Sequence, residues 1–281
     1  MLDREVHYTE WGPQNAQKGH VMCWHGLMRT CRDFDIVAAA LAGDGYHVVC
    51  VDVIGRGLSQ WSPAPEAEYN CGFYAKLAVA VMDALALNTV AWIGTSMGGI
   101  IGYVAAATTL HGTGRLKKLL LNDIGPFVPP AATERILSYC KHAIVCDRFT
   151  ELEKIMSAAY TPFGIQCTEM MRRLVEHGVR RTPDGKFTPH YDRKIVDALG
   201  VGAGGTGIAD VDPWALFDKI ECPTIVLRGI DSDLLLRETV LEMAGRGPKP
   251  PCITIEGCGH APALHTPVQI AVVLRFLNGD A

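Results

Sequence analysis

A serine flanked by glycines stands in the run Gly94–Gly98, whose sequence GTSMG fits the pattern G-x-S-x-G. An apolar run, Val90–Ile93, comes before it and small residues follow it, so we expect a strand, a sharp turn and a helix. A serine on such a turn has a strained backbone and needs small neighbours two residues away. The turn lifts the hydroxyl clear of the chain, over the positive end of the helix. Ser96 is therefore the candidate nucleophile.

A serine hydroxyl is a poor nucleophile until a base takes its proton, and His260 is the histidine best placed to do so. It lies in the glycine-containing run Gly257–Pro262, between the expected strand Cys252–Ile255 and the last expected helix. Such a loop presents an imidazole readily. His265 is the competing base, but it lies beyond the proline, at the start of a helix. We therefore expect His260 to be the base.

A carboxylate must orient the base and stabilise its charged form, and three aspartates that follow expected strands are candidates. Asp231 and Asp233 come just after the strand Thr224–Leu227, and Asp123 follows the preceding strand. Each of them lies between the serine and the histidine in the chain, in the order Ser, Asp, His that such sites have. The order alone therefore leaves all three open.

The oxyanion that forms in the transition state needs N–H donors. The N–H of Met97 lies at the start of the expected helix, and Leu27, after the strand His20–Trp24, can supply the second donor. His25, in the same loop, is expected to brace the turn rather than to carry protons. Asp52 follows another strand and stands near two glycines, so we expect it to fix that turn through side-chain hydrogen bonds.

These residues follow short apolar runs that alternate with helical patterns, which is typical of a mainly parallel sheet covered by helices on both faces. We therefore expect an α/β fold with right-handed connections. Several runs are apolar almost without interruption, as strands buried on both faces should be. The expected strands are His20–Trp24, His47–Asp52, Thr89–Ile93, Lys118–Asn122, Thr224–Leu227 and Cys252–Ile255. The expected helices are Asp33–Leu41, Tyr69–Leu87, Met97–Leu110 and Pro267–Leu277.

The alternation breaks between Gly125 and about Asp212, where the sequence predicts several helices with no strand between them. We expect residues 126–212 to form a helical cap over the carboxyl edge of the sheet, inserted into a core domain of residues 1–125 and 213–281. The run Gly202–Gly207 has the spacing G-x-G-x-x-G, but it follows a helix rather than a strand and so predicts a cap hinge instead of a cofactor site. The expected cap helices are Thr133–Ile144, Phe149–Ala159, Glu169–His177 and Asp192–Leu199.

The composition excludes several classes of protein. The 281 residues are 48% hydrophobic and 20% charged with a net charge of −4, which excludes disorder and argues against nucleic acid as a partner. Ten scattered cysteines without a CxxC pair predict reduced, buried thiols and no metal site. The uncharged stretch 84–114 holds polar residues and glycines near its middle, so no membrane span is expected. The charged amino-terminal residues lack the apolar core of a secretory signal, which predicts a cytoplasmic protein.

Several short motifs carry a resemblance to a known family: His25-Gly26, Asp52 with Gly55-Arg56-Gly57 and Ser59, Gly94–Gly99, Asn122–Pro126, Arg228-Gly229 with Ser232-Asp233, and Gly259-His260. With these motifs the sequence resembles the α/β-hydrolase fold, in particular its capped esterases and C–C hydrolases, over nearly the whole chain outside the cap. The resemblance implies Ser96 as the nucleophile, His260 as the base and an acid after the next-to-last strand. In relatives with Ser-Asp-Leu at this point that aspartate is the acid, which here is Asp233, with Asp231 and Asp123 as alternatives. Epoxide hydrolases and haloalkane dehalogenases of this fold use an aspartate nucleophile, so neither activity is expected.

The loop after the first buried strand reads HGLMR, without the further glycines of HGGG esterases and C–C hydrolases, which favours simple ester hydrolysis. The sequence thus predicts a serine hydrolase that cleaves a small carboxylic ester through an acyl-enzyme on Ser96, without a cofactor. The alternatives are hydrolysis of a C–C bond in a vinylogous diketone (a meta-cleavage product) by the same triad, and a ligand-binding protein without turnover. Arg29 and Arg32 could meet a carboxylate on the substrate, although a surface role is expected for both. A homodimer is compatible with the apolar cap helices, and the side chains expected to line the pocket are Met28, Trp214, Met156 and Phe163.

Overall fold

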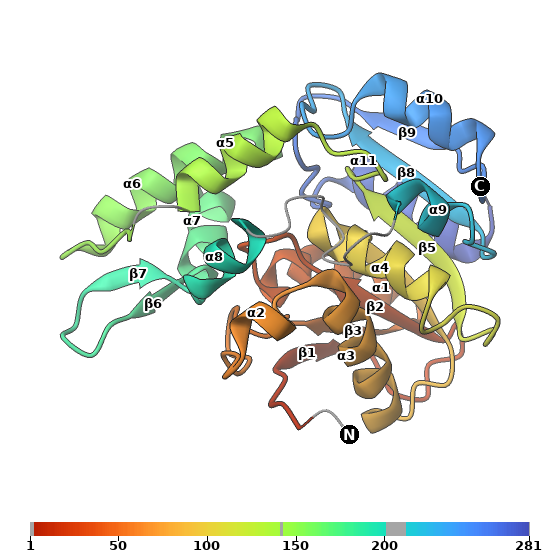
Figure 1. Cartoon of the computed structure of the whole chain (residues 1–281), viewed down its shortest axis with the longest axis horizontal. Coiled ribbons are helices and arrows are strands. Elements are labelled where there is room, and N and C mark those ends of the chain that lie inside the picture. Colours follow the sequence, from red (N-terminus) through yellow and green to blue (C-terminus); the bar gives the residue numbers. More distant parts are fainter. Residues whose placement is uncertain (1–2, 141–142, 201–211, 281) are drawn as a thin grey trace.

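A computed structural model describes residues 3–140, 143–200 and 212–280 of the chain. Its centre is a seven-stranded sheet with the strand order β1-β3-β2-β4-β5-β8-β9 (Figure 1). Neighbouring strands are parallel except β1 and β3, so the expected mainly parallel sheet is confirmed, and the antiparallel edge strand β1 is an addition to it. The strands of this sheet are β1 (Tyr8–Trp11), β2 (His20–Trp24), β3 (His47–Val51), β4 (Val90–Thr95), β5 (Leu116–Asn122), β8 (Thr224–Gly229) and β9 (Cys252–Ile255).

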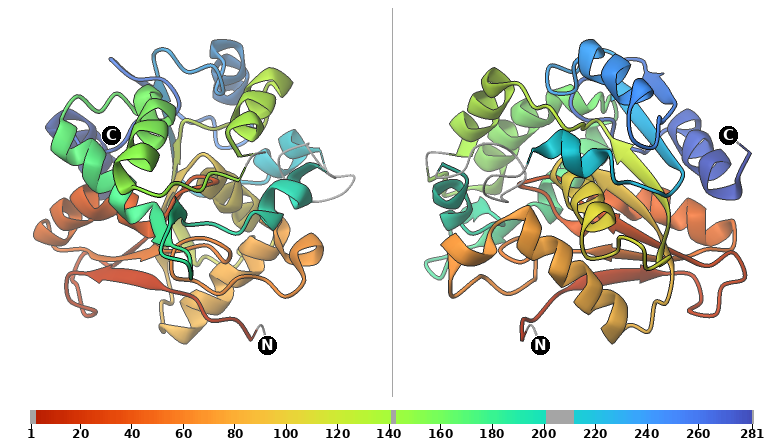
Figure 2. Two further views of the ribbon diagram at one scale, coloured as in Figure 1. Left: turned by 90° about the vertical axis from the view of Figure 1, so that its left-hand side faces the viewer. Right: turned by 45° about the vertical axis from the view of Figure 1, so that its right-hand side comes forward.

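Helices cover both faces of the sheet, as expected (Figure 2). On one face α1 (Asp35–Gly43) and α11 (Pro267–Asn278) bury their apolar sides, and on the other α3 (Cys71–Ala84) and α4 (Met97–Ala107) do so. The rings of Trp24 on β2 and Trp92 on β4 stack 4.8 Å apart beneath α4. This packing fixes the two strands that are followed by the expected oxyanion loop and by the candidate nucleophile. The further helices here are the 3₁₀ helix η1 (Cys31–Phe34), α2 (Pro65–Glu68) and α10 (Arg237–Gly245).

The chain between β5 and β8, residues 123–223, is here called the inserted segment. The four helices expected in it are present, and in Figure 1 they stand to one side of the sheet. The expectation of no strand is wrong, because β6 and β7 form an antiparallel hairpin. Its strands have three residues each, too short to show an alternating pattern. The elements are α5 (Pro130–Cys140), α6 (Phe149–Tyr160), the 3₁₀ helix η2 (Thr161–Phe163), α7 (Thr168–His177), β6 (Val179–Arg181), β7 (Phe187–Pro189), α8 (Lys194–Gly200) and α9 (Pro213–Phe217).

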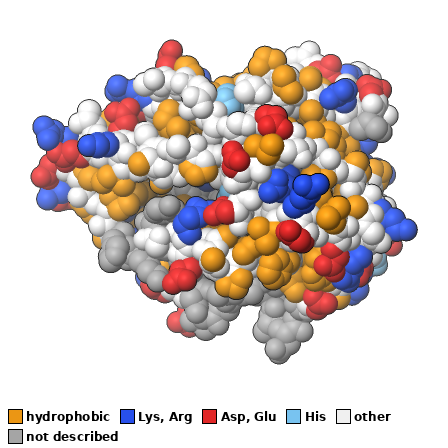
Figure 3. All heavy atoms as spheres, turned by 90° about the horizontal axis from the view of Figure 1, so that it is seen from above, with side chains coloured by type: hydrophobic (Ala, Val, Ile, Leu, Met, Phe, Trp, Pro, Cys, Tyr) orange, Lys and Arg blue, Asp and Glu red, His pale blue; other side chains and the backbone are white. Residues whose placement is uncertain are grey.

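Two further expectations concern the inserted segment and the long uncharged stretch. The glycine-rich run Gly202–Gly207 lies outside the described residues. The stretch 84–114 is built as the buried strand β4 followed by α4, and the described residues contain no helix that is both long and apolar enough to cross a membrane. The face seen in Figure 3 mixes acidic, basic and apolar side chains, and no single sign of charge dominates it.

Candidate active site

Ser96 lies on the turn between β4 and α4, with a backbone φ of +52° and ψ of −117°. Its backbone N–H donates to the carbonyl oxygen of Asn122, 3.0 Å away, which ties the turn to β5. A Cβ on Gly98 would overlap the carbonyl group of Trp24, and one on Gly94 would overlap the backbone of Gly98. The glycines on both sides are therefore required for the strained turn that presents the serine hydroxyl.

His260 lies in the loop between β9 and α11, and its Nε2 is 2.9 Å from Oγ of Ser96. The loop is held from the inserted segment, because the N–H of Gly259 donates to the carbonyl oxygen of Pro162 at 2.7 Å. The structure therefore brings the expected nucleophile and the expected base within hydrogen-bond distance. The competing base, His265, is not at the serine; the N–H of its backbone donates to the side chain of Gln269 in α11.

The carboxylate beside His260 is that of Asp123, whose Oδ2 lies 2.7 Å from Nδ1 of the imidazole. Asp123 directly follows β5, is fully buried and has a φ of +57°. Its Oδ1 accepts a hydrogen bond from the N–H of Gly229 at 2.8 Å, and Oδ2 also accepts one from the hydroxyl of Ser232 at 2.6 Å. A buried carboxylate held in this way is ready to orient the imidazole and to balance its charge.

The expectation that Asp233 orients His260 is corrected by this geometry. Asp233 is exposed, and its two oxygens each lie 2.7 Å from nitrogens of Arg135 on α5. The alternative Asp231 is exposed as well. Between them Ser232 points inward and reaches the carboxylate of Asp123, so the turn after β8 presents a hydroxyl rather than a carboxylate to the site.

Two N–H groups expected to hold an oxyanion lie close to Ser96. Met97 opens α4, so its N–H has no partner within the helix. The carbonyl oxygen of Leu27 accepts a hydrogen bond from Nε of Arg56 at 2.9 Å, whereas its N–H has no acceptor among the described residues. The neighbouring Gly26 brings this loop against the nucleophile, since a Cβ built on Gly26 would lie 3.7 Å from Cβ of Ser96.

Buried polar side chains brace the oxyanion loop from behind. His25, with no exposed surface, accepts a hydrogen bond on Nε2 from the N–H of Val53 at 3.0 Å, and its Nδ1 lies 2.7 Å from the carbonyl oxygen of Gly26. Burial lowers the pKa of His25, which keeps the ring neutral and able to accept. The bracing role expected for His25 therefore agrees with its contacts.

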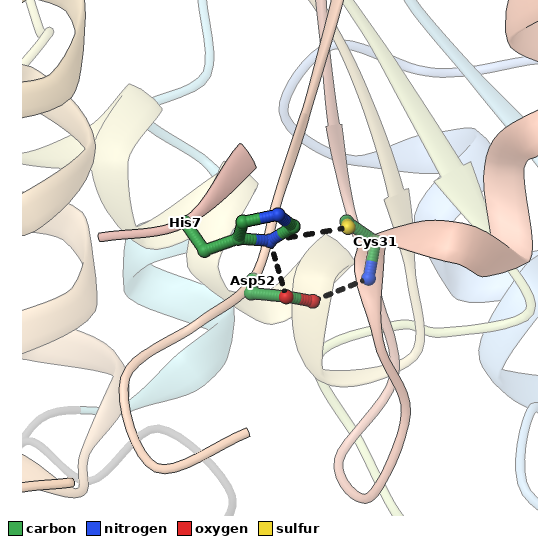
Figure 4. Close-up of side chains that lie close together, drawn as sticks. All are labelled: His7, Cys31 and Asp52. Atoms are coloured by element: carbon green, nitrogen blue, oxygen red, sulfur yellow. Dashed lines mark hydrogen bonds and ion pairs between the residues drawn. The ribbon is translucent and has the colours of Figure 1, made fainter. Parts of the chain in front are cut away.

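Asp52 holds the start of η1 and the turn after β3 (Figure 4). Its oxygens accept from the N–H of Cys31 at 2.7 Å and of Leu58 at 3.1 Å, and Oδ2 lies 2.7 Å from Nδ1 of His7. His7, Cys31 and Asp52 are close enough together to ligate a metal ion. Burial raises the pKa of the Cys31 thiol far above its usual range. Fixing the turn is the role that these contacts support.

A cavity of about 170 Å³ opens above Ser96 and His260. It lies between the ends of the strands and the inserted segment, which contributes side chains from α5, α6, η2 and α7. Of the side chains expected to line a pocket, Met28 and Phe163 do so. Met156 does not, because it is buried between α6 and α7 with Leu152 and Val175. Trp214 does not, because its ring packs against Phe217 of the same helix, α9.

The cavity also contains charged side chains that a surface role would not place there. Arg29 was expected on the surface, yet it is 7% exposed and lines the cavity together with Asp33. Arg32 does keep a partly exposed position, paired with Asp35. Arg135, which the sequence analysis did not single out, reaches the cavity from α5. No local sequence pattern marks these two arginines as cavity residues, because the cavity wall is formed only when the inserted segment packs over the strand ends.

Comparisons with known proteins agree with this geometry. The model of the alpha/beta hydrolase family matches residues 21–273 of the chain. The chain is similar to a 3-hydroxybutyrate-oligomer hydrolase from Cupriavidus necator, with 38% identity over 97% of this chain and 92% of that protein. It is also similar to a non-heme chloroperoxidase from Burkholderia pyrrocinia, with 25% identity over 82% of this chain and 80% of that protein.

Solved structures give the same result. A putative hydrolase from Rickettsia typhi is similar with a TM-score of 0.87 and 29% identity, over 99% of this chain and 92% of that one. An alpha/beta hydrolase from Novosphingobium aromaticivorans is similar with a TM-score of 0.83 and 29% identity, over 99% of both chains. The match of the family model over most of the chain, together with these relatives, shows that the chain belongs to the alpha/beta hydrolase family and is a hydrolase.

Proposed function

We propose that the protein hydrolyses a small carboxylic ester through an acyl-enzyme on Ser96. The observation that carries this proposal is the hydrogen-bonded chain from Ser96 through His260 to the buried carboxylate of Asp123. In this proposal they act as the nucleophile, the base and the orienting acid of a serine hydrolase. The sequence motifs support Ser96 and His260 in these roles, and the contact between Asp123 and His260 supports Asp123 as the acid.

The first half of the reaction forms the acyl-enzyme. Oγ of Ser96 attacks the ester carbonyl carbon while Nε2 of His260 takes the hydroxyl proton, and the buried carboxylate stabilises the imidazolium that results. The carbonyl oxygen becomes an oxyanion, which accepts hydrogen bonds from the N–H groups of Leu27 and Met97 at the positive end of α4. The tetrahedral intermediate then collapses, the C–O bond of the ester breaks, and His260 gives its proton to the departing alcohol.

The second half releases the acid. Water replaces the alcohol, and His260 takes a proton from it as the water oxygen attacks the acyl carbon. Collapse of the second tetrahedral intermediate breaks the bond to Oγ, and the histidine returns the proton to Ser96. The net reaction is ester plus water giving an acid and an alcohol, and no cofactor takes part in it.

The substrate is proposed to be a short ester of a hydroxy acid. The relative from Cupriavidus necator is named for the hydrolysis of 3-hydroxybutyrate oligomers, and its similarity extends over nearly the whole chain. The cavity of about 170 Å³ suits a substrate of a few carbon atoms, since a cavity of about 150 Å³ holds a benzene molecule. We also propose that residues 126–212 form the cap over a core of residues 1–125 and 213–281, because that segment supplies the roof of the cavity.

The test is fluorophosphonate labelling combined with hydrolysis of p-nitrophenyl butyrate and of the linear 3-hydroxybutyrate dimer. We expect one label per chain, lost in Ser96→Ala together with at least about 10⁴-fold in kcat. Ser138→Ala is the matched control, because Ser138 is exposed on α5 and its hydroxyl donates to a backbone carbonyl. Labelling without turnover of any ester would overturn ester hydrolysis and favour cleavage of a C–C bond; unlabelled wild-type protein would remove Ser96 as the nucleophile.

A further inference from the structure

Arg29 is a cation enclosed in the cavity above the proposed nucleophile. It belongs to the loop that follows β2 and is 7% exposed. Its Nε and Nη2 lie 2.8 Å and 2.6 Å from the two oxygens of Asp33, which makes a bidentate ion pair. That pair fixes the orientation of the guanidinium plane.

Two aromatic rings from the inserted segment pack against the guanidinium. Its central carbon lies 4.1 Å from the ring centre of Tyr160 on α6 and 5.6 Å from that of Phe163 in η2. Burial by itself would lower the pKa of Arg29, but Asp33 and Tyr160 more than offset this and the pKa is raised. Arg29 therefore stays charged at every pH at which the protein is folded.

The third nitrogen of the guanidinium, Nη1, is buried and has no hydrogen-bond partner among the described residues. Burying its two N–H groups therefore costs desolvation free energy that no hydrogen bond offsets. In native proteins such an orphaned donor calls for an acceptor from outside the chain. Arg29 lines the cavity, so a substrate that displaces the side chains covering Nη1 can supply that acceptor.

Arg29 lines the same cavity as Ser96 and His260. A Cβ built on Gly26 would lie 3.5 Å from Cγ of Arg29 and 3.7 Å from Cβ of Ser96, so both side chains begin beside the same glycine. The charged side chains of the wall are paired within the chain: Arg29 with Asp33, and Arg135 with Asp233, which lies outside the wall. Because Nε and Nη2 are bound to Asp33, Nη1 is the nitrogen of Arg29 that remains for a ligand.

We propose that Nη1 of Arg29 binds a free carboxylate on the substrate, so that the protein selects anionic esters such as short hydroxy-acid oligomers over neutral ones. This inference rests on the proposed function, since it names the substrate class of the same site. A carboxylate supplies the strong acceptor that Nη1 lacks. In a linear hydroxy-acid dimer this carboxylate ends the unit whose hydroxyl group forms the ester bond.

The test compares two substrates that differ only in that group: the linear 3-hydroxybutyrate dimer and its terminal primary amide. Both contain the same ester bond, and chromatography measures its cleavage. We expect wild-type kcat/KM to be about 10- to 100-fold higher for the acid than for the amide, mainly through KM. In Arg29→Met the ratio of the two kcat/KM values falls to about 1, and in Arg29→Lys it lies between these limits, because a lysine keeps the charge and loses the planar fork.

Arg32→Met is the matched control, because Arg32 is the neighbouring arginine, pairs with Asp35 and does not line the cavity. It should keep the wild-type ratio. The inference is overturned if the wild-type protein cleaves acid and amide equally well, or if Arg29→Met keeps the wild-type preference. If Arg29→Met does not fold, the wild-type ratio and Arg29→Lys still decide. Failure of the proposed function looks different, since the wild-type protein would then cleave neither substrate, or Ser96→Ala would still cleave both.

Discussion

The hydroxyl of Ser232 donates to Oδ2 of Asp123 at 2.6 Å, and the same oxygen lies 2.7 Å from Nδ1 of His260. One carboxylate oxygen thus joins the turn after β8 to the proposed base. The other oxygen accepts from the N–H of Gly229, so the fully buried Asp123 has a partner on each oxygen. Ser232 and Gly229 position this carboxylate, and the carboxylate positions the imidazole.

Asp123→Asn is expected to lower kcat/KM by about 10³- to 10⁴-fold, because an amide at this position favours the wrong tautomer of His260. Asp233→Asn should stay within about threefold of the wild-type value, since Asp233 is exposed and pairs with Arg135. The measurement is hydrolysis of p-nitrophenyl butyrate by both variants, with circular dichroism to show that each is folded. The reverse ranking of the two variants would restore Asp233 as the acid.

Ser232→Ala removes one donor from a buried carboxylate and is expected to lower kcat by about tenfold, which is the effect of one lost hydrogen bond to a charged group. Ser232→Thr keeps the hydroxyl and should recover most of the rate. Because the same Oγ also accepts from the N–H groups of Leu234 and Leu235, the free energy of unfolding must be measured alongside. A loss of stability with unchanged kcat would assign Ser232 a purely structural role.

The proposed nucleophile and base could be picked out from the sequence because both depend on local patterns. Ser96 stands between glycines that the turn requires, and His260 lies in a short loop after an apolar strand. The acid could not be chosen in this way. Asp123, Asp231 and Asp233 all follow strands, and what separates them is the direction in which each side chain leaves its turn. That direction is set by packing between β5 and β8, which are far apart in the chain.

The parallel sheet could also be predicted, since its strands are continuous apolar runs. The cavity wall could not. Met156 and Trp214 look like pocket residues by type, yet both pack against other side chains of the inserted segment. Met156 packs with Leu152 and Val175, and Trp214 packs against Phe217. Arg29 looks like a surface residue by type, yet Asp33 pairs with it and Tyr160 covers it. In each case the outcome depends on how the inserted segment lies over the strand ends, which no local pattern encodes.

Gly98→Ala tests the requirement for a glycine after the nucleophile. A methyl group there would overlap the carbonyl group of Trp24 on β2, so the turn must shift. We expect a loss of about 1–3 kcal/mol in the free energy of unfolding and a slower fluorophosphonate reaction of Ser96. Gly43→Ala at the end of α1 is the matched control, because nothing lies within 4 Å of its added methyl group. Equal behaviour of the two variants in urea unfolding would contradict the steric argument.

His25 gives the fold a dependence on pH whose sign follows from its burial. Burial lowers the pKa of His25 in the folded protein, whereas in the unfolded chain it is about 6.5. Above pH 6.5 the ring is neutral in both states and contributes nothing to the pH dependence. Below that value the unfolded chain binds a proton that the folded protein excludes, so the free energy of unfolding falls as the pH falls.

His25→Gln is expected to weaken this dependence, because glutamine does not titrate and its side-chain oxygen can still accept from the N–H of Val53. Urea unfolding at pH 7.5 and 5.5 should show a smaller difference between the two pH values in His25→Gln than in the wild type, by up to about 1.4 kcal/mol. A lower stability of the variant at pH 7.5 does not affect this test, because the test uses only the difference in unfolding free energy between the two pH values. His111→Gln alters an exposed loop histidine and should keep the wild-type difference. If His25→Gln also kept the wild-type difference, the loss of stability at low pH would have to come from other groups. The titration of His25 would then not contribute to the pH dependence of the unfolding free energy.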